Sequence, residues 1–212
     1  MSGEQRFERW SSSYERSMLQ SLLFDRVHAA IFRAAGSGPV PQAVLDVGCG
    51  TGRLLREMHR RWPQAEVIGV DIAPGMIAEA RRLASCGQFV VAPAEHLPLP
   101  AQSVDLAVST MSFHHWTDKA EGIREIARVL RPDGRFILAD HIAPRWLRLL
   151  GATPTFSSQE RRSAFAAAGL TVSEQSPVLS RYLLLTVGRK GTRSQPPQGP
   201  PDPQAAGRAR TL

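Results

Sequence analysis

The sequence is poor in several features, and each scarcity narrows the possible functions. Two cysteines among 212 residues exclude a disulfide framework. No apolar run approaches the roughly eighteen residues that a transmembrane helix needs, so we expect no membrane span. The start of the chain carries Glu4, Arg6, Glu8 and Arg9 and lacks the apolar core of a secretory signal, which favours a cytoplasmic protein.

Lysine is also nearly absent, because arginine supplies almost all of the positive charge. The formal net charge is +7, but residues 189–212 alone carry +4. The remaining +3 is a weak electrostatic footprint for nucleic-acid binding. Residues 191–212 are rich in proline, glycine and glutamine without apolar periodicity, so we expect a disordered basic tail.

The rest of the chain alternates between short apolar runs and amphipathic stretches. This pattern, ending in a hairpin, predicts an α/β fold of the Rossmann-like kind: a seven-stranded, mostly parallel sheet with one antiparallel strand and helices on both faces. We expect residues 1–38 to form a helical cap, 39–190 the main domain, and Pro132–Gly134 a turn. Expected strands are 43–48, 66–71, 88–92, 104–110, 135–141, 171–178 and 181–187, and expected helices are 18–34, 53–61, 74–84, 118–130 and 157–168.

The most informative segment is residues 44–52, which read VLDVGCGTG. The apolar run suits a buried parallel strand whose polar exception, Asp46, stands near the carboxyl end. Gly48, Gly50 and Gly52 then let the backbone turn sharply and approach a ligand. The spacing is G-x-G-x-G, not the G-x-G-x-x-G of dinucleotide folds, and no phosphate-binding P-loop is present. Taken alone, such a turn is also compatible with a purely structural connection.

A second strand, residues 66–72, places Asp71 about twenty residues beyond the glycines. In doubly wound folds a carboxylate at this place accepts hydrogen bonds from the ribose hydroxyls of a bound nucleoside. The alternative is that Asp71 only caps the helix that starts near Pro74. The two motifs at this separation favour the ligand interpretation.

Four segments together resemble the class I S-adenosylmethionine-dependent methyltransferases, in the broad group that includes ubiquinone and menaquinone biosynthesis enzymes. They cover most of residues 40–142 in the family's order and spacing, which implies the methyltransferase form of the Rossmann-like fold. They read VLDVGCGTGRL at 44–54, VIGVDIAPGMIAEAR at 67–81, AEHLPLPAQSVDLAVSTMSFHHW at 94–116 and REIARVLRPDGRFILAD at 124–140.

The resemblance implies S-adenosyl-L-methionine as cofactor and a role for each matching residue. Family members usually read Asp-Ala-Glu after the third strand, and this chain has Pro93 in place of the Asp that takes the adenine amino group. The implied cofactor contacts are Gly48, Gly50 and Gly52 around the methionine part, Asp46 to its ammonium, Asp71 to the ribose diol, Ile72, Ala94 and Glu95 near the adenine, the Ser109 carbonyl near the ammonium, and Tyr14 at the carboxylate end.

Three histidines at the carboxyl edge of the sheet are candidates for a general base: His114, His115 and His141. Imidazole titrates near neutrality and can take a proton from an attacking oxygen, nitrogen or carbon. The alternative is that the His-His-Trp segment is structural and only covers the cofactor. These residues with Asp140 fit no standard zinc spacing, so we expect no metal.

The resemblance favours methylation of a small-molecule acceptor, such as a quinone precursor or another secondary metabolite. Methylation of nucleic acid or protein is an alternative, although the chain lacks the Asn/Asp-Pro-Pro-Tyr/Phe tetrad typical of base methylation and any appended recognition module. A third possibility is a non-catalytic S-adenosylmethionine-binding protein, which Pro93 would suit. The chain is compatible with a monomer or a homodimer.

Overall fold

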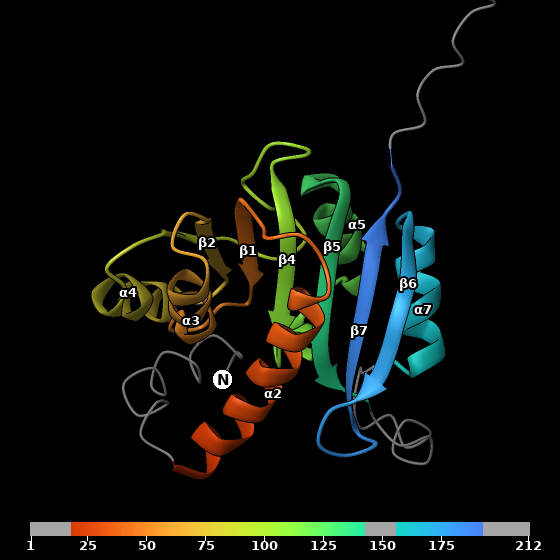
Figure 1. Ribbon diagram of the computed structural model, residues 1–212, viewed down its shortest axis with the longest axis horizontal. Helices are drawn as coiled ribbons and strands as arrows, with labels where there is room; N and C mark the ends of the chain where they lie inside the picture. The colour runs from red at the N-terminus through yellow and green to blue at the C-terminus, as the bar shows by residue number, and fades with distance from the viewer. Residues whose placement is uncertain (1–17, 143–155, 193–212) are drawn as a thin grey trace, which may run out of the picture.

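The computed structural model describes residues 18–142 and 156–192. Within these ranges seven strands form one sheet in the order β3-β2-β1-β4-β5-β7-β6 (Figure 1). Neighbouring strands from β3 to β5 are parallel, whereas β7 is antiparallel to both β5 and β6, so the predicted topology is confirmed. The strands are β1 (Ala43–Val47), β2 (Glu66–Asp71), β3 (Gln88–Val91), β4 (Val104–Thr110), β5 (Leu130–His141), β6 (Leu170–Pro177) and β7 (Leu183–Lys190).

Helices cover both faces of the sheet, as the sequence predicts. They are α2 (Met18–Gly36), α3 (Arg53–Arg61), α4 (Pro74–Leu83), α5 (Lys119–Val129), α7 (Ser158–Ala167) and the short 3-10 helix η2 (Phe113–His115). Helices α2, α3 and α4 bury residues such as Ile31 and Leu55 on one face, and α5 and α7 bury Ile126 and Phe165 on the other (Figure 1). Strand β1 is therefore buried at every position, and Asp46 is its one charged residue.

Strand β5 begins earlier than the sequence predicts. It starts at Leu130, which pairs with Val104 of β4, and the register shifts before Arg135. The predicted turn at 132–134 lies inside this irregular stretch, and Asp133 has a left-handed φ of 62°. The predicted start at residue 135 was wrong because a turn signal marks a local bend and does not reveal pairing on its far side.

Local signals place the last helix correctly. Ser157 is the N-cap of α7: its hydroxyl accepts a hydrogen bond from the Glu160 N–H, and the Glu160 carboxylate accepts one from the Ser157 N–H. Gly169 follows the helix with a φ of 77°, which is the left-handed conformation expected at its end. Residues 178–182 then connect the antiparallel pair β6 and β7.

The predicted N-terminal helix is present as α2, which packs against the sheet. The boundaries 1–38, 39–190 and 191–212 remain predictions, since residues 1–17 and 193–212 lie outside the described ranges. In the part of the chain that the structure describes, no helix is both long enough and apolar enough to cross a membrane.

Candidate functional site

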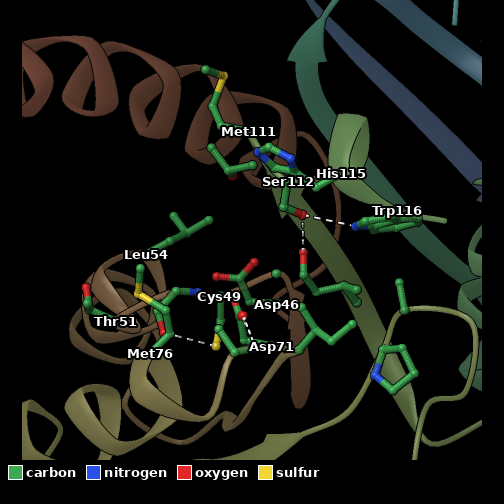
Figure 2. Close-up of a pocket in the computed structure, with 18 of the residues that line it drawn as sticks. Asp46, Cys49, Thr51, Leu54, Asp71, Met76, Met111, Ser112, His115 and Trp116 are labelled. Atoms are coloured by element: carbon green, nitrogen blue, oxygen red, sulfur yellow. Dashed lines mark hydrogen bonds between the residues drawn. The ribbon is translucent and has the colours of Figure 1, made fainter. Parts of the chain in front are cut away.

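A cavity lies at the carboxyl edge of β1, β2 and β4 (Figure 2). Its walls come from the glycine loop after β1, the end of β2, the segment after β3, the end of β4 and helix α2. The strand order changes direction between β1 and β4. In open α/β sheets this is the place where ligands bind.

The glycine loop forms the floor of this cavity. Gly48, Gly50 and Gly52 all have left-handed φ values, of 75°, 54° and 76°. The Gly48 N–H donates to the Val70 carbonyl of β2 at 2.7 Å, which fixes the loop against the neighbouring strand. Gly52 is the N-cap of α3, so the helix starts directly after the third glycine. This explains the G-x-G-x-G spacing, because no further residue separates the loop from the helix.

Asp71 joins the end of β2 to the glycine loop. Its Oδ2 accepts a hydrogen bond from the Gly50 N–H at 2.8 Å, and its Oδ1 accepts one from the Ala73 N–H at 2.9 Å. Burial raises the pKa of this carboxyl above its ordinary value, although the hydrogen bonds from Ala73 and Gly50 oppose that shift. The helix-cap alternative is therefore partly realised, and because the backbone N–H groups of Gly50, Ile72 and Ala73 all interact with it, the carboxylate keeps about one of its four lone-pair positions for a ligand hydroxyl.

Asp46 is the most unusual acid of the cavity. Its side chain is 2% exposed, and its Oδ1 has no hydrogen-bond partner among the described residues. Burial, together with the negative charge of Asp71, raises the pKa of Asp46 to about 8. A buried carboxylate without a partner is costly, so a cation brought to this oxygen would be strongly stabilised. Figure 2 shows Asp46 beside Asp71, at the centre of the lining residues.

The segment after β3 closes another side of the cavity with Pro93, Ala94 and Glu95. Glu95 already has a protein partner, since its Oε1 accepts a hydrogen bond from the Asp118 N–H at 2.9 Å. Ile72 lies at the same cavity with 53% of its surface exposed, which is unusual for isoleucine. An exposed apolar side chain at the edge of a cavity suits contact with a flat aromatic ligand.

The segment that follows β4 contributes Met111 and Ser112 to the cavity, and of these Ser112 was not singled out from the sequence. Met111 lines the cavity in a left-handed conformation, with a φ of 53°. A non-glycine residue with such backbone strain is often found at a functional site. Ser112 also lines the cavity, and its hydroxyl contacts the Val47 carbonyl, the Ser109 hydroxyl and the Trp116 indole N–H. Ser112 thereby ties the β4 edge to the end of β1.

Helix α2 supplies a further wall through Phe24 and His28. His28 Nδ1 lies 3.0 Å from Glu57 Oε2 of α3, and Arg53 at the start of α3 forms ion pairs with Asp25 and Glu57. Burial opposes ionisation of Glu57, but His28 and Arg53 outweigh it and keep the pKa of that carboxyl below its ordinary value. These polar contacts hold α2 against α3 at the cavity.

Most of the predicted cofactor contacts line this one cavity. Those that do are Asp46, Gly48, Gly50, Asp71, Ile72, Ala94 and Glu95. Gly52 instead caps α3, and Ser109 is fully buried with its hydroxyl 3.0 Å from that of Ser112. Tyr14 lies outside the described residues.

The three candidate histidines occupy different positions along the same edge. His115 lines the cavity, and its ring centroid lies 3.9 Å from that of His114. His114 Nδ1 lies 2.8 Å from Oδ1 of Asp140, the buried acid near the end of β5. His141 is exposed, with its ring centroid 5.6 Å from that of His114. The structure therefore brings the three imidazoles together, and the His114 ring lies within hydrogen-bond distance of Asp140.

Comparison with known proteins gives these residues a context. Residues 45–138 match the family model described as a methyltransferase domain. The chain is 31% identical over 116 residues to the demethylmenaquinone methyltransferase of Thermotoga maritima, covering 55% of this chain and 51% of that protein. It is 36% identical over 139 residues to the malonyl-[acyl-carrier protein] O-methyltransferase of Geobacter sulfurreducens, covering 63% of this chain and 50% of the relative. The chain thus spans about half the length of these curated relatives.

Solved structures resemble the chain over a larger share of its length. The protein in complex with the Haloferax volcanii Trm112 methyltransferase activator shares 27% identity and a TM-score of 0.71, over 87% of this chain and 97% of that chain. The YcgJ protein of Bacillus subtilis shares the fold, with 22% identity, a TM-score of 0.65 and coverage of 77% and 98%. Residues 45–138 thus match a methyltransferase domain, and the sheet order and the glycine loop agree with the fold of these solved structures.

Proposed function

We propose that this protein transfers a methyl group from S-adenosylmethionine to a small-molecule acceptor. The observation that carries the proposal is the unpartnered, fully buried Oδ1 of Asp46, which lies in the same cavity as the glycine loop and Asp71. The cofactor carries an ammonium group, a ribose diol and an adenine ring. The cavity offers an acid without a partner for the first and an acid with a spare lone pair for the second.

The residues present fit this cofactor at three of its parts. Asp46 would hold the ammonium, Asp71 the ribose hydroxyls, and Ile72 would cover one face of the adenine. Pro93 removes the acid that relatives use for the adenine amino group, so that contact falls to backbone groups near Ala94. Losing one neutral hydrogen bond costs about 0.5–1.5 kcal/mol, which weakens binding by roughly tenfold or less.

When bound, S-adenosylmethionine supplies a methyl group on a positively charged sulfur, which is already a strong electrophile. The protein's own work is to position the acceptor and to exclude water. Apolar side chains suited to that work line the cavity: Leu54, Met76, Met111 and Trp116. The names of the relatives, which concern demethylmenaquinone and malonyl-[acyl-carrier protein], support a small molecule or a small acyl group as the acceptor class.

Thermal unfolding with S-adenosylmethionine and S-adenosylhomocysteine tests the cofactor part of this proposal. A native-state ligand at about 100 times its dissociation constant adds roughly 2.7 kcal/mol, which raises the midpoint by several degrees. Gly50→Arg should abolish the rise, because a side chain at this open position enters the cavity. Gly36→Arg is the matched control: Gly36 also has no neighbour within 4 Å of an added Cβ, but it lies at the end of α2.

Two outcomes decide the matter. A rise in the wild-type chain and in Gly36→Arg that disappears in Gly50→Arg supports a cofactor site at the glycine loop. Absence of any rise at millimolar concentrations of both ligands would overturn the proposal and leave a protein with a decayed site.

A further inference from the structure

One side of the cavity is lined by side chains that cannot form hydrogen bonds. Strand β2 lies between β3 and β1, so the segment after β3 and the glycine loop lie on opposite sides of Asp71. The segment after β3 contributes Ala92, Pro93 and Ala94, and Ile72 follows Asp71 directly. The side chains of these four residues carry no donor or acceptor. The cavity is therefore polar on the side of the glycine loop and apolar on the side of β3.

This asymmetry fixes how the proposed cofactor lies. Its ribose joins the methionine part to the adenine, so the two parts extend from the ribose in different directions. With the ammonium at Asp46 of β1 and the ribose at Asp71 of β2, the base extends away from β1. It then lies beside Pro93 and its neighbours in the segment after β3.

Two polar side chains of the cavity, Glu95 and Thr117, provide no dedicated acceptor for an amino group. Glu95 Oε1 accepts the Asp118 N–H at 2.9 Å, and the negative charge of Glu95 interacts favourably with Lys119. Thr117 is exposed, and its hydroxyl can donate as well as accept, so it fits an amino group or another polar group equally. Glu95 is thus committed to the protein, and Thr117 is unselective.

The backbone of the same segment is also partly engaged. The Ala92 N–H donates to the Asp71 carbonyl at 3.1 Å, and the Pro93 carbonyl accepts the His96 N–H at 3.2 Å. Pro93 itself has no N–H to offer. The contacts that remain for the edge of a base are with neutral backbone groups, such as those of Ala94. A hydrogen bond to a neutral group is weaker than one to a carboxylate.

Selectivity for a ligand group is large when its absence leaves a buried polar group of the protein unpaired. Proline has no such group to leave unpaired. We infer that Pro93 relaxes the selectivity of the cavity for the exocyclic amino group of adenine, so that a nucleoside without this group binds nearly as well. The inference rests on the proposed function, and it makes Pro93 a residue that sets cofactor specificity.

Isothermal titration calorimetry with the full chain tests this inference without any methyl transfer. The two probes are S-adenosylhomocysteine and its analogue with unsubstituted purine, which lacks only the exocyclic amino group and keeps every ring nitrogen. Their dissociation constants for the wild-type chain should differ by less than about tenfold, which is the range of one neutral hydrogen bond. A larger difference would overturn the inference, because it requires a charged acceptor such as Glu95.

A variant should create the selectivity that the wild-type chain lacks. Pro93→Asp places a carboxylate in the wall of the cavity, and it should raise the ratio of the two dissociation constants above about tenfold. Pro98→Asp is the matched control: Pro98 is exposed and does not line the cavity, so the same added charge should leave the ratio unchanged. An unchanged ratio in a Pro93→Asp chain that still binds S-adenosylhomocysteine would overturn the role of Pro93.

The outcomes separate this inference from the function on which it rests. If the wild-type chain binds neither probe, the proposed function is overturned and the inference falls with it. If it binds S-adenosylhomocysteine and rejects the purine analogue, the inference alone is overturned. The wild-type measurement needs no variant, so it decides the question even if Pro93→Asp does not fold.

Discussion

The Asp71 carboxylate and the Gly50 N–H form a hydrogen bond of 2.8 Å that joins β2 to the glycine loop. The acid that we propose for the ribose therefore also shapes the loop that would surround the methionine part. Because Asp71 accepts the Ala73 N–H as well, its two oxygens are both engaged before any ligand arrives. A substitution at this position should affect the loop and the ligand together.

Asp71→Asn should lower both the stability and the affinity for S-adenosylhomocysteine. An amide offers one acceptor oxygen, so at least one of the backbone N–H groups of Gly50, Ile72 and Ala73 loses its partner, at a cost of about 1–3 kcal/mol. Affinity should fall at least tenfold in isothermal titration calorimetry, since ribose hydroxyls lose an ionised acceptor.

The matched control is Asp105→Asn. Asp105 also accepts two backbone N–H groups, those of Gln42 and Ala43, both on Oδ2 at 2.9 Å, but it does not line the cavity. Its carboxylate also pairs with Arg131, and Asn would lose the charge of that ion pair while keeping one oxygen for the two N–H groups. This variant should lose stability and keep its affinity. Equal loss of affinity in both variants would mean that Asp71 acts only through the fold.

Asp46 should make the stability of the unliganded protein fall with rising pH. Its pKa is raised to about 8 from 3.8, so between these values the folded chain holds a proton that the unfolded chain releases. The sign follows directly: stability decreases as pH rises through this range, by at most about 1.4 kcal/mol per pH unit. Denaturant melts should show this slope in the wild-type chain relative to Asp46→Asn.

The same titration should make cofactor binding depend on pH. Ionised Asp46 attracts an ammonium and the protonated form does not, so affinity for S-adenosylhomocysteine should rise between about pH 6 and pH 8. Asp46→Asn should bind weakly at every pH. A wild-type affinity that is flat across this range would contradict the assignment of the ammonium to Asp46.

The sequence brought Asp46, Gly48 and Asp71 to one edge of the sheet because the motifs that carry them are local. Asp46 and Gly48 share one strand–loop–helix unit, and the motif that places Asp71 lies on the next strand. The parallel pairing of β1 with β2 then brings the two acids to one edge of the sheet. The walls from the glycine loop, the end of β2 and the segment after β3 follow from residues that can be found by spacing alone.

The acceptor half depends on contacts between distant residues and was less accessible. His114 and Asp140 were both noticed at the sheet edge, but their pairing depends on the register of β4 with β5. No sequence pattern predicts the burial of Arg161, because an arginine on a helix is expected to be exposed to solvent, whereas this one is fully buried. The role of Ser112 could not be predicted from the sequence either, although its hydroxyl contacts Val47, Ser109 and Trp116.

Gly48→Ala should be strongly destabilising. An added Cβ would fall on the side chain of Ser112, far inside van der Waals contact, and the φ of 75° is itself unfavourable for alanine. Strain of about 1–2 kcal/mol from the backbone and about 1–3 kcal/mol from the clash is expected. Gly50→Ala should show only the first part, since its Cβ would meet nothing within 4 Å. Adding Ser112→Gly to Gly48→Ala should restore part of the loss, and no restoration in chemical denaturation would contradict the steric explanation.

Arg161→Met should cost more stability than any substitution of a surface arginine. The guanidinium is fully buried and lies 5.6 Å from the Phe113 ring centroid. It donates to three backbone carbonyls, those of Asp140 and His141 in β5 and of Leu184 in β7. Methionine fills a similar volume but leaves those carbonyls unpaired, so we expect a loss of about 3–5 kcal/mol in denaturant melts.

Arg162→Met is the control: Arg162 is exposed and its side chain donates a hydrogen bond to Gln175 at 2.7 Å, so this variant should change stability by about 0.5 kcal/mol or less. Arg161→Lys should fall between the wild type and Arg161→Met, because an ammonium is a point donor and cannot span three carbonyls as a planar fork does. Equal stability of Arg161→Met and Arg162→Met would show that the carbonyls find other partners, and the end of β5 would then not depend on Arg161.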